Sequence, residues 1–404
     1  MKIKISKGIA RGTVEAPPSK SMAHRMLICA GLSKGTCTVH GIADSKDVLA
    51  TIECLETLGV KFTRKEDSII VEGVDLKKAA PQKILYCNES GSTLRFFVPL
   101  CLVSGREATL SGRKRLLERP LGIYKTLCDE RKLRFIQEED KVVVQGPLKS
   151  GCFKLAGNVS SQFISGLLFA LPLLEGDSKL TITPPIESRA YIDMTMDALA
   201  AFGVETWWDD ENTILIKGNQ EYKADEVRVE GDYSNAAFFE ALNAIGGEVT
   251  ITNLNPDSIQ GDKVYDKCFE HLKEGTPTLN ISDCPDLGPV LFVVAAAKNG
   301  GVFSGTNRLK IKESDRGEVM ATELRKFGVS AGVYDNEVII YPTGFGTPSE
   351  ELSGHNDHRI VMALSILLTL TGGIIDGAEA VQKSFPDFFG KLNSLGIEVT
   401  EIEN

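Results

Sequence analysis

Residues 160–174 read SSQFISGLLFALPLL, in which three polar residues are followed by an almost wholly apolar run without a charge. A helix that is apolar on every face has to be buried on every side. Ser160 is a favourable cap for the first turn of such a helix. The segment therefore predicts a helix at the centre of a domain, with a polar turn at its amino-terminal end.

This combination of a polar turn and an apolar helix occurs six times along the chain, mostly about 70 residues apart. The six copies are 19–32, 90–103, 160–174, 232–245, 286–297 and 356–370. A second, more amphipathic helix is expected after each copy. These second helices are expected at 47–58, 120–131, 191–202, 263–273, 316–327 and 385–395. Four of them end in Gly before Val or Ile, as at residues 58–60, which is typical of a helix end and a strand start.

Short strands complete the repeats, for example SIIV at 68–71 and EVII at 337–340. Six β-α-β-α-β-β units fit the chain, most naturally as three plus three. Three buried helices inside a ring of sheets and outer helices form one domain, so we predict an α/β protein of two such domains. A cleft between two domains is the default place for a small-molecule site.

Composition limits the kinds of function. The 404 residues carry a net charge of −10, which argues against a general binder of nucleic acid or of anionic membranes. Nine cysteines without a Cys-x-x-Cys pair suit a reducing compartment and offer no zinc spacing. The first residues lack the apolar core of a signal peptide, and the apolar runs are too short to span a bilayer. We therefore expect a cytoplasmic monomer without a nucleic-acid or membrane partner.

Cations stand at the starts of the buried helices in the amino-terminal half. Lys20 and Arg25 lie just inside the first helix, and Arg95 lies just inside the second. Unpaired N–H groups and the helix dipole make a helix start favourable for an anion and unfavourable for a cation. A single Ser at such a turn is an ordinary cap, but cations placed there indicate a bound anion.

A second polar set lies in the carboxy-terminal half. Lys312, Glu313 and Arg316 share one helix start, and Asp286 precedes one of the most apolar helices. Asp286 could simply cap that helix, and residues 312–316 could be a solvated charged turn. A carboxylate beside a lysine is also a pair capable of general acid–base catalysis. Many cations with a few carboxylates predict a substrate with two or more anionic groups and a proton-transfer step.

Four motifs, in this order, resemble the 5-enolpyruvylshikimate-3-phosphate synthases over the full chain. They are PPSKS at 17–21 with Arg25, SSQF at 160–163, KESDR at 312–316 and NDHR at 356–359. The resemblance implies the two-domain inside-out α/β fold of that family, with six repeats in all. It implies one domain of residues 1–18 and 231–404 and another of residues 19–230, with the active site in the cleft between them.

The resemblance also implies an activity. In this family the enolpyruvyl group of phosphoenolpyruvate moves to the 5-hydroxyl of shikimate 3-phosphate and phosphate is released, without a metal or organic cofactor. The residues expected to hold shikimate 3-phosphate are Lys20, Ser21, Arg25, Ser160, Ser161, Gln162, Ser188, Tyr191, Asp286 and Lys312. Those expected to hold phosphoenolpyruvate are Lys20, Gly91, Arg119, Gln162, Arg316, Arg359 and Lys383.

The implied reaction gives roles to the catalytic candidates Asp286, Lys312, Glu313 and Lys20. The 5-hydroxyl loses a proton as it attacks C2 of phosphoenolpyruvate, C3 gains one, and the tetrahedral intermediate then loses phosphate and a C3 proton. Asp286 is the expected base for the hydroxyl, and Lys20 lies near both ligands. Glu313 is expected to move the proton at C3, with Lys312 as its partner or as the acid toward phosphate. The sequence leaves the split between Lys312 and Glu313 open.

Two positions depart from the family pattern. Glu89 opens the turn Glu-Ser-Gly-Ser where members often have Asn-Ala-Gly-Thr or Asn-Ser-Gly-Thr, although Gly91 is retained. Arg308 stands where some members carry an Asn that contacts the shikimate. We therefore do not expect that contact here.

Two other functions fit the sequence less well. The related enzyme that acts on UDP-N-acetylglucosamine uses a loop cysteine, and residues 111–118 contain none. DNA sliding clamps also contain six related α/β units, but their channel helices need basic faces toward DNA. The repeated helices here are apolar all round, and their cations stand only at the starts.

Overall fold

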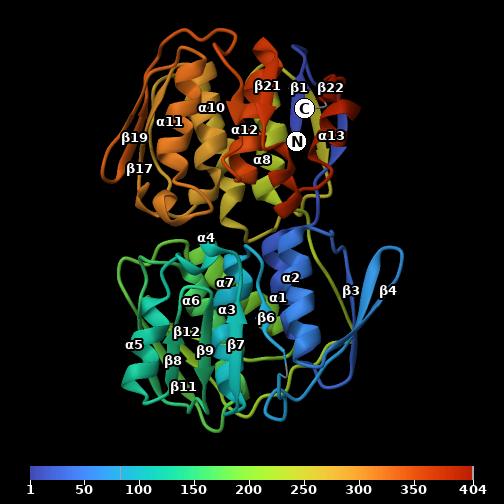
Figure 1. The fold of residues 1–404 in the computed structure, drawn as a ribbon, viewed down its shortest axis with the longest axis vertical. Helices are drawn as coiled ribbons and strands as arrows, with labels where there is room; N and C mark the ends of the chain where they lie inside the picture. The colour runs from blue at the N-terminus through green and yellow to red at the C-terminus, as the bar shows by residue number, and fades with distance from the viewer. Residues whose placement is uncertain (82, 403–404) are drawn as a thin grey trace. The chain divides into compact units, whose positions relative to one another are not determined.

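The computed structural model of the protein describes residues 1–81 and 83–402. The chain forms two compact units (Figure 1). We call Met1–Ser19 together with Gly231–Asn404 the first unit, and Lys20–Glu230 the second unit. The first unit is therefore built from both ends of the chain, and the second from one continuous segment.

The two segments that leave and re-enter the first unit are paired with each other. Pro18 and Gly231 form an isolated antiparallel bridge, and the amide of Asp232 donates a hydrogen bond to the carbonyl of Pro17 at 2.8 Å. The amino-terminal segment is thus anchored to the first unit at the point where the chain departs from it.

The second unit contains three four-stranded sheets. Its strands are β3 (Thr36–His40), β4 (Lys61–Arg64), β5 (Ser68–Glu72), β6 (Leu85–Tyr86), β7 (Glu107–Ser111), β8 (Arg134–Gln137), β9 (Lys141–Gln145), β10 (Cys152–Ala156), β11 (Ser178–Thr183), β12 (Thr206–Asp210), β13 (Thr213–Ile216) and β14 (Glu226–Arg228). The strand orders are β14-β3-β5-β4, β6-β7-β9-β8 and β10-β11-β13-β12. In each sheet the first pair is parallel and the remaining pairs are antiparallel. Strand β14, the last of the unit, completes the sheet of its first repeat.

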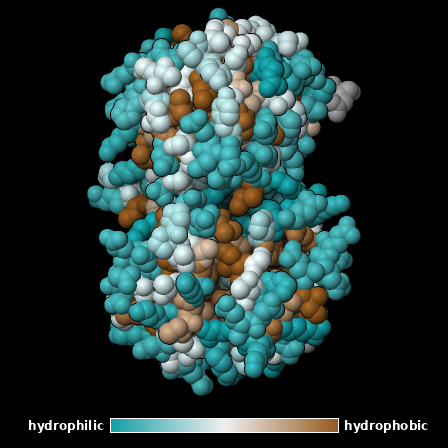
Figure 2. All heavy atoms as spheres, turned by 90° about the vertical axis from the view of Figure 1, so that its left-hand side faces the viewer, coloured by the Kyte–Doolittle hydropathy of each residue, from teal (hydrophilic) through white to brown (hydrophobic). Residues whose placement is uncertain are grey.

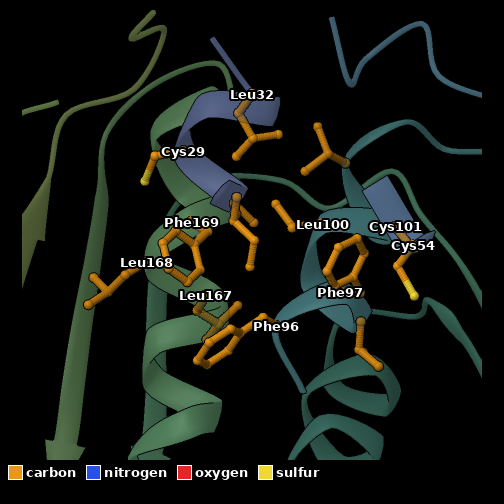
Figure 3. Packing of buried hydrophobic residues seen from close by; sticks show 14 of the residues in the cluster. Cys29, Leu32, Cys54, Phe96, Phe97, Leu100, Cys101, Leu167, Leu168 and Phe169 are labelled. Carbon is orange, nitrogen blue, oxygen red and sulfur yellow. The ribbon is translucent and has the colours of Figure 1, made fainter. Parts of the chain in front are cut away.

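Three helices, α1, α3 and α6, form the centre of the second unit. Its helices are α1 (Lys20–Gly31), α2 (Lys46–Thr57), α3 (Gly91–Val103), α4 (Lys114–Leu117), α5 (Gly122–Glu130), α6 (Ser161–Ala170) and α7 (Arg189–Ala201), with a 3-10 turn η1 (Leu171–Leu173). Phe96 of α3 packs edge to face on Phe169 of α6, with ring centres 5.3 Å apart (Figure 3). Leu100 of α3 and Leu167 of α6 belong to the same core. The all-round apolar pattern thus results in burial of these helices, as the sequence predicts.

The first unit repeats this construction. Its strands are β1 (Lys2–Ile5), β2 (Arg11–Glu15), β15 (Glu248–Thr252), β16 (Thr278–Asn280), β17 (Gly301–Ser304), β18 (Ala331–Val333), β19 (Glu337–Ile340), β20 (Leu352–Ser353), β21 (Gly373–Asp376) and β22 (Val399–Ile402). Its helices are α8 (Tyr233–Ala244), α9 (Tyr265–Glu274), α10 (Gly288–Ala297), α11 (Arg316–Lys326), α12 (His358–Thr371) and α13 (Phe388–Ser394). The 3-10 turns are η2 (Gly261–Val264), η3 (Pro285–Leu287), η4 (Asn307–Ile311) and η5 (Ala378–Lys383). Helices α8, α10 and α12 are the buried ones, and their core is separate from that of the second unit.

One of the six repeats is shortened. The orders β16-β17-β19-β18 and β20-β21-β1-β22 match those of the second unit, but the remaining sheet has only the parallel pair β15-β2. Residues 275–277 alone connect α9 to β16, so the chain has no room for a strand hairpin there. The amino-terminal strand β1 lies between β21 and β22, and this places both ends of the chain in one sheet (Figure 1).

Several helix starts differ by two or three residues from those that the sequence predicts. Asp286, expected to precede an apolar helix, lies in the 3-10 turn Pro285–Leu287, and the α-helix begins at Gly288. The helix expected from residue 385 begins at Phe388, after Pro386. Phe385 directly precedes Pro386, and the residue before a proline is biased away from helical geometry, which favours this delayed start.

Hydrophilic side chains dominate the face of the molecule in Figure 2, and hydrophobic side chains gather there in a few patches.

Within residues 1–81 and 83–402, no helix is both long and apolar enough to cross a membrane. All nine cysteines are free thiols, and only Cys152 is exposed.

Close approach of α3 and α6 requires Gly166. A Cβ atom there would overlap the hydroxyl of Tyr124 and lie 2.5 Å from the carbonyl oxygen of Arg95. We expect Gly166→Ala to destabilise the protein by about 1–3 kcal/mol, because the two helices have to separate. Urea unfolding followed by circular dichroism measures this change.

Gly122→Ala is the matched control. It lies at the start of α5, where an added Cβ meets no atom within 4 Å. This variant should be neutral or more stable by up to about 1 kcal/mol. Equal stabilities of the two variants would contradict the close packing of α3 on α6.

Candidate active site

Lys20 is the first residue of α1, and the protein supplies its counter-charge. Its ammonium donates to Oδ2 of Asp47 at 2.9 Å, and the two side chains are 17% and 9% exposed. Asp47 lies in the first turn of α2, where the helix dipole favours a carboxylate. The sequence argument that only a bound anion offsets Lys20 is therefore incomplete, since Asp47 also does so.

Arg25 is a buried cation whose acceptors are neutral. Its Nε donates to the hydroxyl of Thr195 at 2.9 Å, and its two Nη atoms donate to the carbonyls of Ser21 and Tyr191 at 2.6 and 2.9 Å. Burial lowers the pKa of Arg25 to about 10. The side chain therefore remains charged at neutral pH, and a bound anion would find a positive charge that these neutral acceptors do not cancel.

Gln162 is held between α3 and α6. The guanidinium of Arg95 donates to its Oε1 at 2.6 Å, and its own Nε2 donates to the hydroxyl of Ser92 at 3.0 Å. Ser160 caps α6 by accepting the amide of Gln162 at 3.3 Å. Ser160 is therefore an ordinary helix cap, and the same cap holds Gln162 at the start of α6.

Gly91 lets Arg119 lie against the first turn of α3. A Cβ on Gly91 would be 2.7 Å from an Nη atom of Arg119, whose side chain is buried. The unexpected acid Glu89 lies next to this turn, and its carboxylate is 3.6 Å from Arg113. The extra negative charge is therefore offset by Arg113.

The remaining expected residues of the second unit also lie at helix starts. Ser188 occupies the N-cap position of α7 without a side-chain capping bond; it adopts a left-handed conformation (φ 56°, ψ 44°) and is buried. The ring of Tyr191, in the first turn of α7, lies 5.9 Å from the guanidinium of Arg25. Ser161 opens α6, and Ser21 is the second residue of α1. The structure thus places every expected residue of the second unit at the start of α1, α3, α6 or α7, or, for Arg119, against such a start.

Arg316 joins three carboxylates in the first unit. Its Nε lies 2.9 Å from Asp357, one Nη 2.9 Å from Asp286 and the other Nη 2.8 Å from Glu313. Only 1% of its side chain is exposed. Burial alone would lower the pKa of Arg316, but the carboxylates, Asp357 first, raise it above its ordinary value. The guanidinium is therefore permanently charged and holds η3, α11 and the start of α12 together.

Asp286 accepts hydrogen bonds from three cations. Its Oδ1 lies 3.0 Å from Lys312 and 2.9 Å from Arg316, and its Oδ2 lies 3.3 Å from Arg359. Burial raises the pKa of Asp286, but Arg359, Lys312 and Arg316 outweigh it and bring that pKa well below the ordinary value. Asp286 lies inside the 3-10 turn η3, and Leu287 occupies the N-cap position of α10, so the interpretation of Asp286 as a simple helix cap is wrong.

Lys312 has a lowered pKa in this cluster. Burial lowers it most, Asp286 raises it, and Arg308 and Arg316 lower it further, which brings it to about 8. An amine with this pKa exists in both protonation states near neutral pH, as a proton carrier requires. The departure from the family pattern at Arg308 thus affects the site through its charge.

Lys383 lies at the end of η5, beside the start of α12. Its ammonium donates to the carbonyl of Asn356 at 2.5 Å. Arg359, in the first turn of α12, also donates to the main-chain carbonyl of Asp286 at 3.2 Å. The structure therefore brings the expected cations of the first unit to the same helix start.

Sequence reasoning left three carboxylates out of the site. Asp47 is the partner of Lys20, and Asp357 is the partner of Arg316 although it looks only like a cap. Asp262 in η2 is buried, and burial raises its pKa to about 6, with Asp286 adding to the rise. An acidic residue at a helix start is the one local signal that these positions share, and it does not distinguish a site residue from a cap.

Among the described residues, no group of three or more His, Cys, Asp or Glu side chains could hold a metal ion. Lys and Arg side chains of the two clusters can bind anions, and Asp286, Lys312 and Glu313 carry groups that can exchange protons.

Comparisons with known proteins agree with these features. A sequence model of the EPSP synthases (3-phosphoshikimate 1-carboxyvinyltransferases) matches residues 6–392. The chain belongs to the EPSP synthase family. This assignment confirms the resemblance drawn from the four motifs and excludes a sliding clamp.

Individual relatives match over almost the whole chain. The 3-phosphoshikimate 1-carboxyvinyltransferase of Clostridium perfringens (strain 13 / Type A) is 41% identical, and the alignment covers 98% of each chain. That of Clostridium acetobutylicum is 39% identical over 99% of this chain and 98% of its own. The solved structure of EPSP synthase from Acinetobacter baumannii matches with a TM-score of 0.78 and 25% identity over 99% of this chain and all of its own. The two-domain inside-out α/β fold is thereby confirmed.

Removal of Arg316 tests its part in the first unit. We expect Arg316→Met to lower the free energy of unfolding by about 3–5 kcal/mol, because buried Asp357 and the partly buried Asp286 and Glu313 lose their common partner. Arg325→Met, an exposed site on the same helix, is the control and should change stability by less than about 0.5 kcal/mol. A small effect in Arg316→Met, measured by urea unfolding, would mean that the carboxylates are compensated in another way.

Proposed function

We propose that the two clusters described above bind and convert the substrates of the family's reaction. The chain is an enolpyruvyl transferase of the shikimate pathway, on the route to chorismate and the aromatic amino acids, and it uses phosphoenolpyruvate and shikimate 3-phosphate. It moves the enolpyruvyl group to the 5-hydroxyl of shikimate 3-phosphate and releases phosphate. The observation that carries the assignment of residues is the gathering of buried cations at the starts of the central helices.

Shikimate 3-phosphate is proposed to bind mainly to the second unit. Arg25 is charged, buried and surrounded by neutral acceptors, so the phosphate would supply its missing counter-charge. Ser160, Ser161 and Gln162 add hydroxyl and amide groups at the start of α6. Hydrogen bonds from an arginine to a phosphate are among the strong ones in proteins. Ser21, Ser188 and Tyr191 complete this proposed subsite.

Phosphoenolpyruvate is proposed to meet cations from both units. Lys20, Gly91, Arg119 and Gln162 would contribute from the second unit, and Arg316, Arg359 and Lys383 from the first. This proposal puts the active site in a cleft between the two enolpyruvyl-transferase domains, 1–18 with 231–404 and 19–230. Two clusters of like charge repel each other until an anionic ligand bridges them, so we also propose that substrates close this cleft.

Asp286 is proposed as the base that removes the proton of the 5-hydroxyl. Without ligands its carboxylate is a weak base, because Lys312, Arg316 and Arg359 contact it. The anionic groups of phosphoenolpyruvate compete for Arg359 and Lys312. Loss of these contacts raises the pKa of Asp286, so the arrival of the donor strengthens the base.

Lys312 and Glu313 are proposed to complete the proton transfers. Lys312 has a pKa of about 8 and is suited to protonate the leaving phosphate. Glu313 is held by Arg316 at 2.8 Å and is assigned to the proton at C3. We further propose a cytoplasmic monomer that has no nucleic-acid or membrane partner and needs no cofactor.

The direct test is phosphate release on mixing the protein with phosphoenolpyruvate and shikimate 3-phosphate. We expect phosphate and 5-enolpyruvylshikimate 3-phosphate in equal amounts, the latter identified by mass spectrometry. Omission of shikimate 3-phosphate, or its replacement by UDP-N-acetylglucosamine, should abolish release. Release with the latter acceptor alone would overturn the proposal.

Asp286→Asn separates chemistry from binding. The variant keeps the shape and an acceptor oxygen but loses the basicity, so turnover should fall by roughly 10²–10⁴-fold. The affinity for shikimate 3-phosphate, measured by calorimetry, should change by no more than about tenfold, or about 1.4 kcal/mol. Near-normal turnover would remove Asp286 from the catalytic residues.

The pH dependence reports on Lys312. As the acid, it has to be protonated, so kcat/KM for phosphoenolpyruvate should decline as the pH rises through about 8. Lys312→Arg should lose this decline, because a guanidinium stays charged over the whole range. A wild-type profile that stays flat between about pH 7 and pH 9 would exclude this role.

Stability does not explain such a decline. The pKa of Lys312 is about 8 in the folded protein and 10.5 in its ordinary state. Between these values the unfolded chain binds more protons, so this group's contribution to stability grows as the pH rises. Thermal unfolding at each pH serves as the control.

A further inference from the structure

A ladder of polar contacts joins α1 to α2 inside the second unit. The upper rung is Lys20 Nζ to Asp47 Oδ2 at 2.9 Å, and the lower rung is His24 Nδ1 to Thr51 Oγ1 at 2.8 Å. The members of each helix are four residues apart and therefore lie on the same helix face. The lower rung is completely buried, since His24 is 1% and Thr51 0% exposed.

The lower rung continues to the turn at the start of α3. The hydroxyl oxygens of Thr51 and Thr93 are 2.7 Å apart, and the hydroxyl of Thr93 donates to Oγ of Ser90 at 2.7 Å. Ser90 directly precedes Gly91, against which Arg119 lies. One chain of hydrogen bonds thus connects the helix that carries Lys20 with the turn that carries Gly91.

The hydrogens in this chain all point in one direction. Thr93 has one hydroxyl hydrogen and gives it to Ser90, so Thr51 is the donor to Thr93. Thr51 then has no hydrogen left for the imidazole, so His24 donates from Nδ1. Burial, helped by the charges of Lys20 and Arg25, lowers the pKa of His24 well below its ordinary value, and a neutral ring protonated on Nδ1 follows.

The cap of α3 does not require this chain. Ser90 caps the helix by accepting the amide of Thr93 at 3.2 Å, and neither Thr51 nor His24 takes part in that bond. Nε2 of His24 is buried without a hydrogen-bond partner among the described residues. A buried polar network is costly compared with apolar packing of the same shape, so a merely structural contact between these helices would be better made by hydrocarbon.

We infer that His24, Thr51 and Thr93 are positioning residues that fix the Gly91 turn relative to Lys20, and so align the proposed binding groups for phosphoenolpyruvate. This inference rests on the proposed function. Lys20 and Gln162 are expected to serve both substrates. The groups expected to hold shikimate 3-phosphate alone, such as Arg25, Ser160 and Ser188, lie outside the chain of hydrogen bonds. Its loss should therefore weaken the use of one substrate and leave the other almost unchanged.

Thr51→Val tests the inference, because it removes the central hydroxyl and keeps the shape. We expect KM for phosphoenolpyruvate to rise by about tenfold to a hundredfold, as small misplacements of binding groups do. The Kd of shikimate 3-phosphate, measured by calorimetry without phosphoenolpyruvate, should change by less than about threefold. Thr51→Ser keeps the hydroxyl and should restore KM.

Two further variants sharpen the test. Thr93→Val breaks the same chain of hydrogen bonds. The double variant with Thr51→Val and Thr93→Val should have a KM for phosphoenolpyruvate within about twofold of the poorer single variant, because both changes act through one network. Thr369→Val is the matched control: it removes a buried hydroxyl that donates to Ile366 in the first unit, away from both clusters. Thr369→Val should leave both substrate constants unchanged.

The outcomes are distinguishable. An unchanged KM for phosphoenolpyruvate in folded Thr51→Val, or an equal loss of affinity for both substrates, overturns the inference. If Thr51→Val does not fold, the same comparison of KM for phosphoenolpyruvate with Kd for shikimate 3-phosphate is made on Thr93→Val. A wild-type protein that releases no phosphate would instead show that the proposed function itself fails.

Discussion

When a helix is buried along its whole length, the unpaired N–H groups of its first turn have to be satisfied at the edge of the core. The central helices of both units begin where the apolar core ends, so their unpaired N–H groups and positive dipole ends lie at that edge. Ser90, Ser160, Asp232 and Asp357 satisfy part of this demand as caps. The N–H groups that no cap satisfies, together with the positive end of the helix dipole, favour anions. The inside-out fold thus produces a set of helix starts that favour anions, as a consequence of its core.

The two units compensate their buried cations in different ways. In the second unit Arg25 is surrounded by carbonyl and hydroxyl oxygens, and burial lowers its pKa. In the first unit Arg316 contacts three carboxylates, which raise its pKa. A bound phosphate therefore gains more from the uncompensated charge of the second unit. The first unit has instead the carboxylates and the lysine that proton transfer requires. This difference supports the proposal that the second unit mainly binds shikimate 3-phosphate and the first unit supplies the proton-transfer groups.

Local sequence could predict the central helices, since an all-round apolar pattern leaves a helix no other place, and the four motifs located the polar helix starts. It could not identify the partner of Lys20, because Asp47 lies on another helix and an acidic first turn is common. The insertion of β1 between β21 and β22 was also beyond local pattern, since it depends on hydrogen bonds between opposite ends of the chain. The shortened repeat results from the connection of only three residues between α9 and β16. A search for similar segments finds the repeat but does not detect that its hairpin is missing.

Under the proposed function, the charges of the first unit also control when Asp286 can act as a base. Asp286 accepts hydrogen bonds from Lys312, Arg316 and Arg359, which lower its pKa. The carboxylate is therefore ionised but is a weak base. Arg316 also contacts Glu313 and Asp357, which hold it in place. Lys312 and Arg359 are, under the proposed function, the cations that turn to the incoming anion. Under the proposed function, the donor substrate therefore removes two of the three cations from Asp286 and leaves one. The remaining Arg316 contact keeps the carboxylate in place, so that its basicity rises without loss of its position.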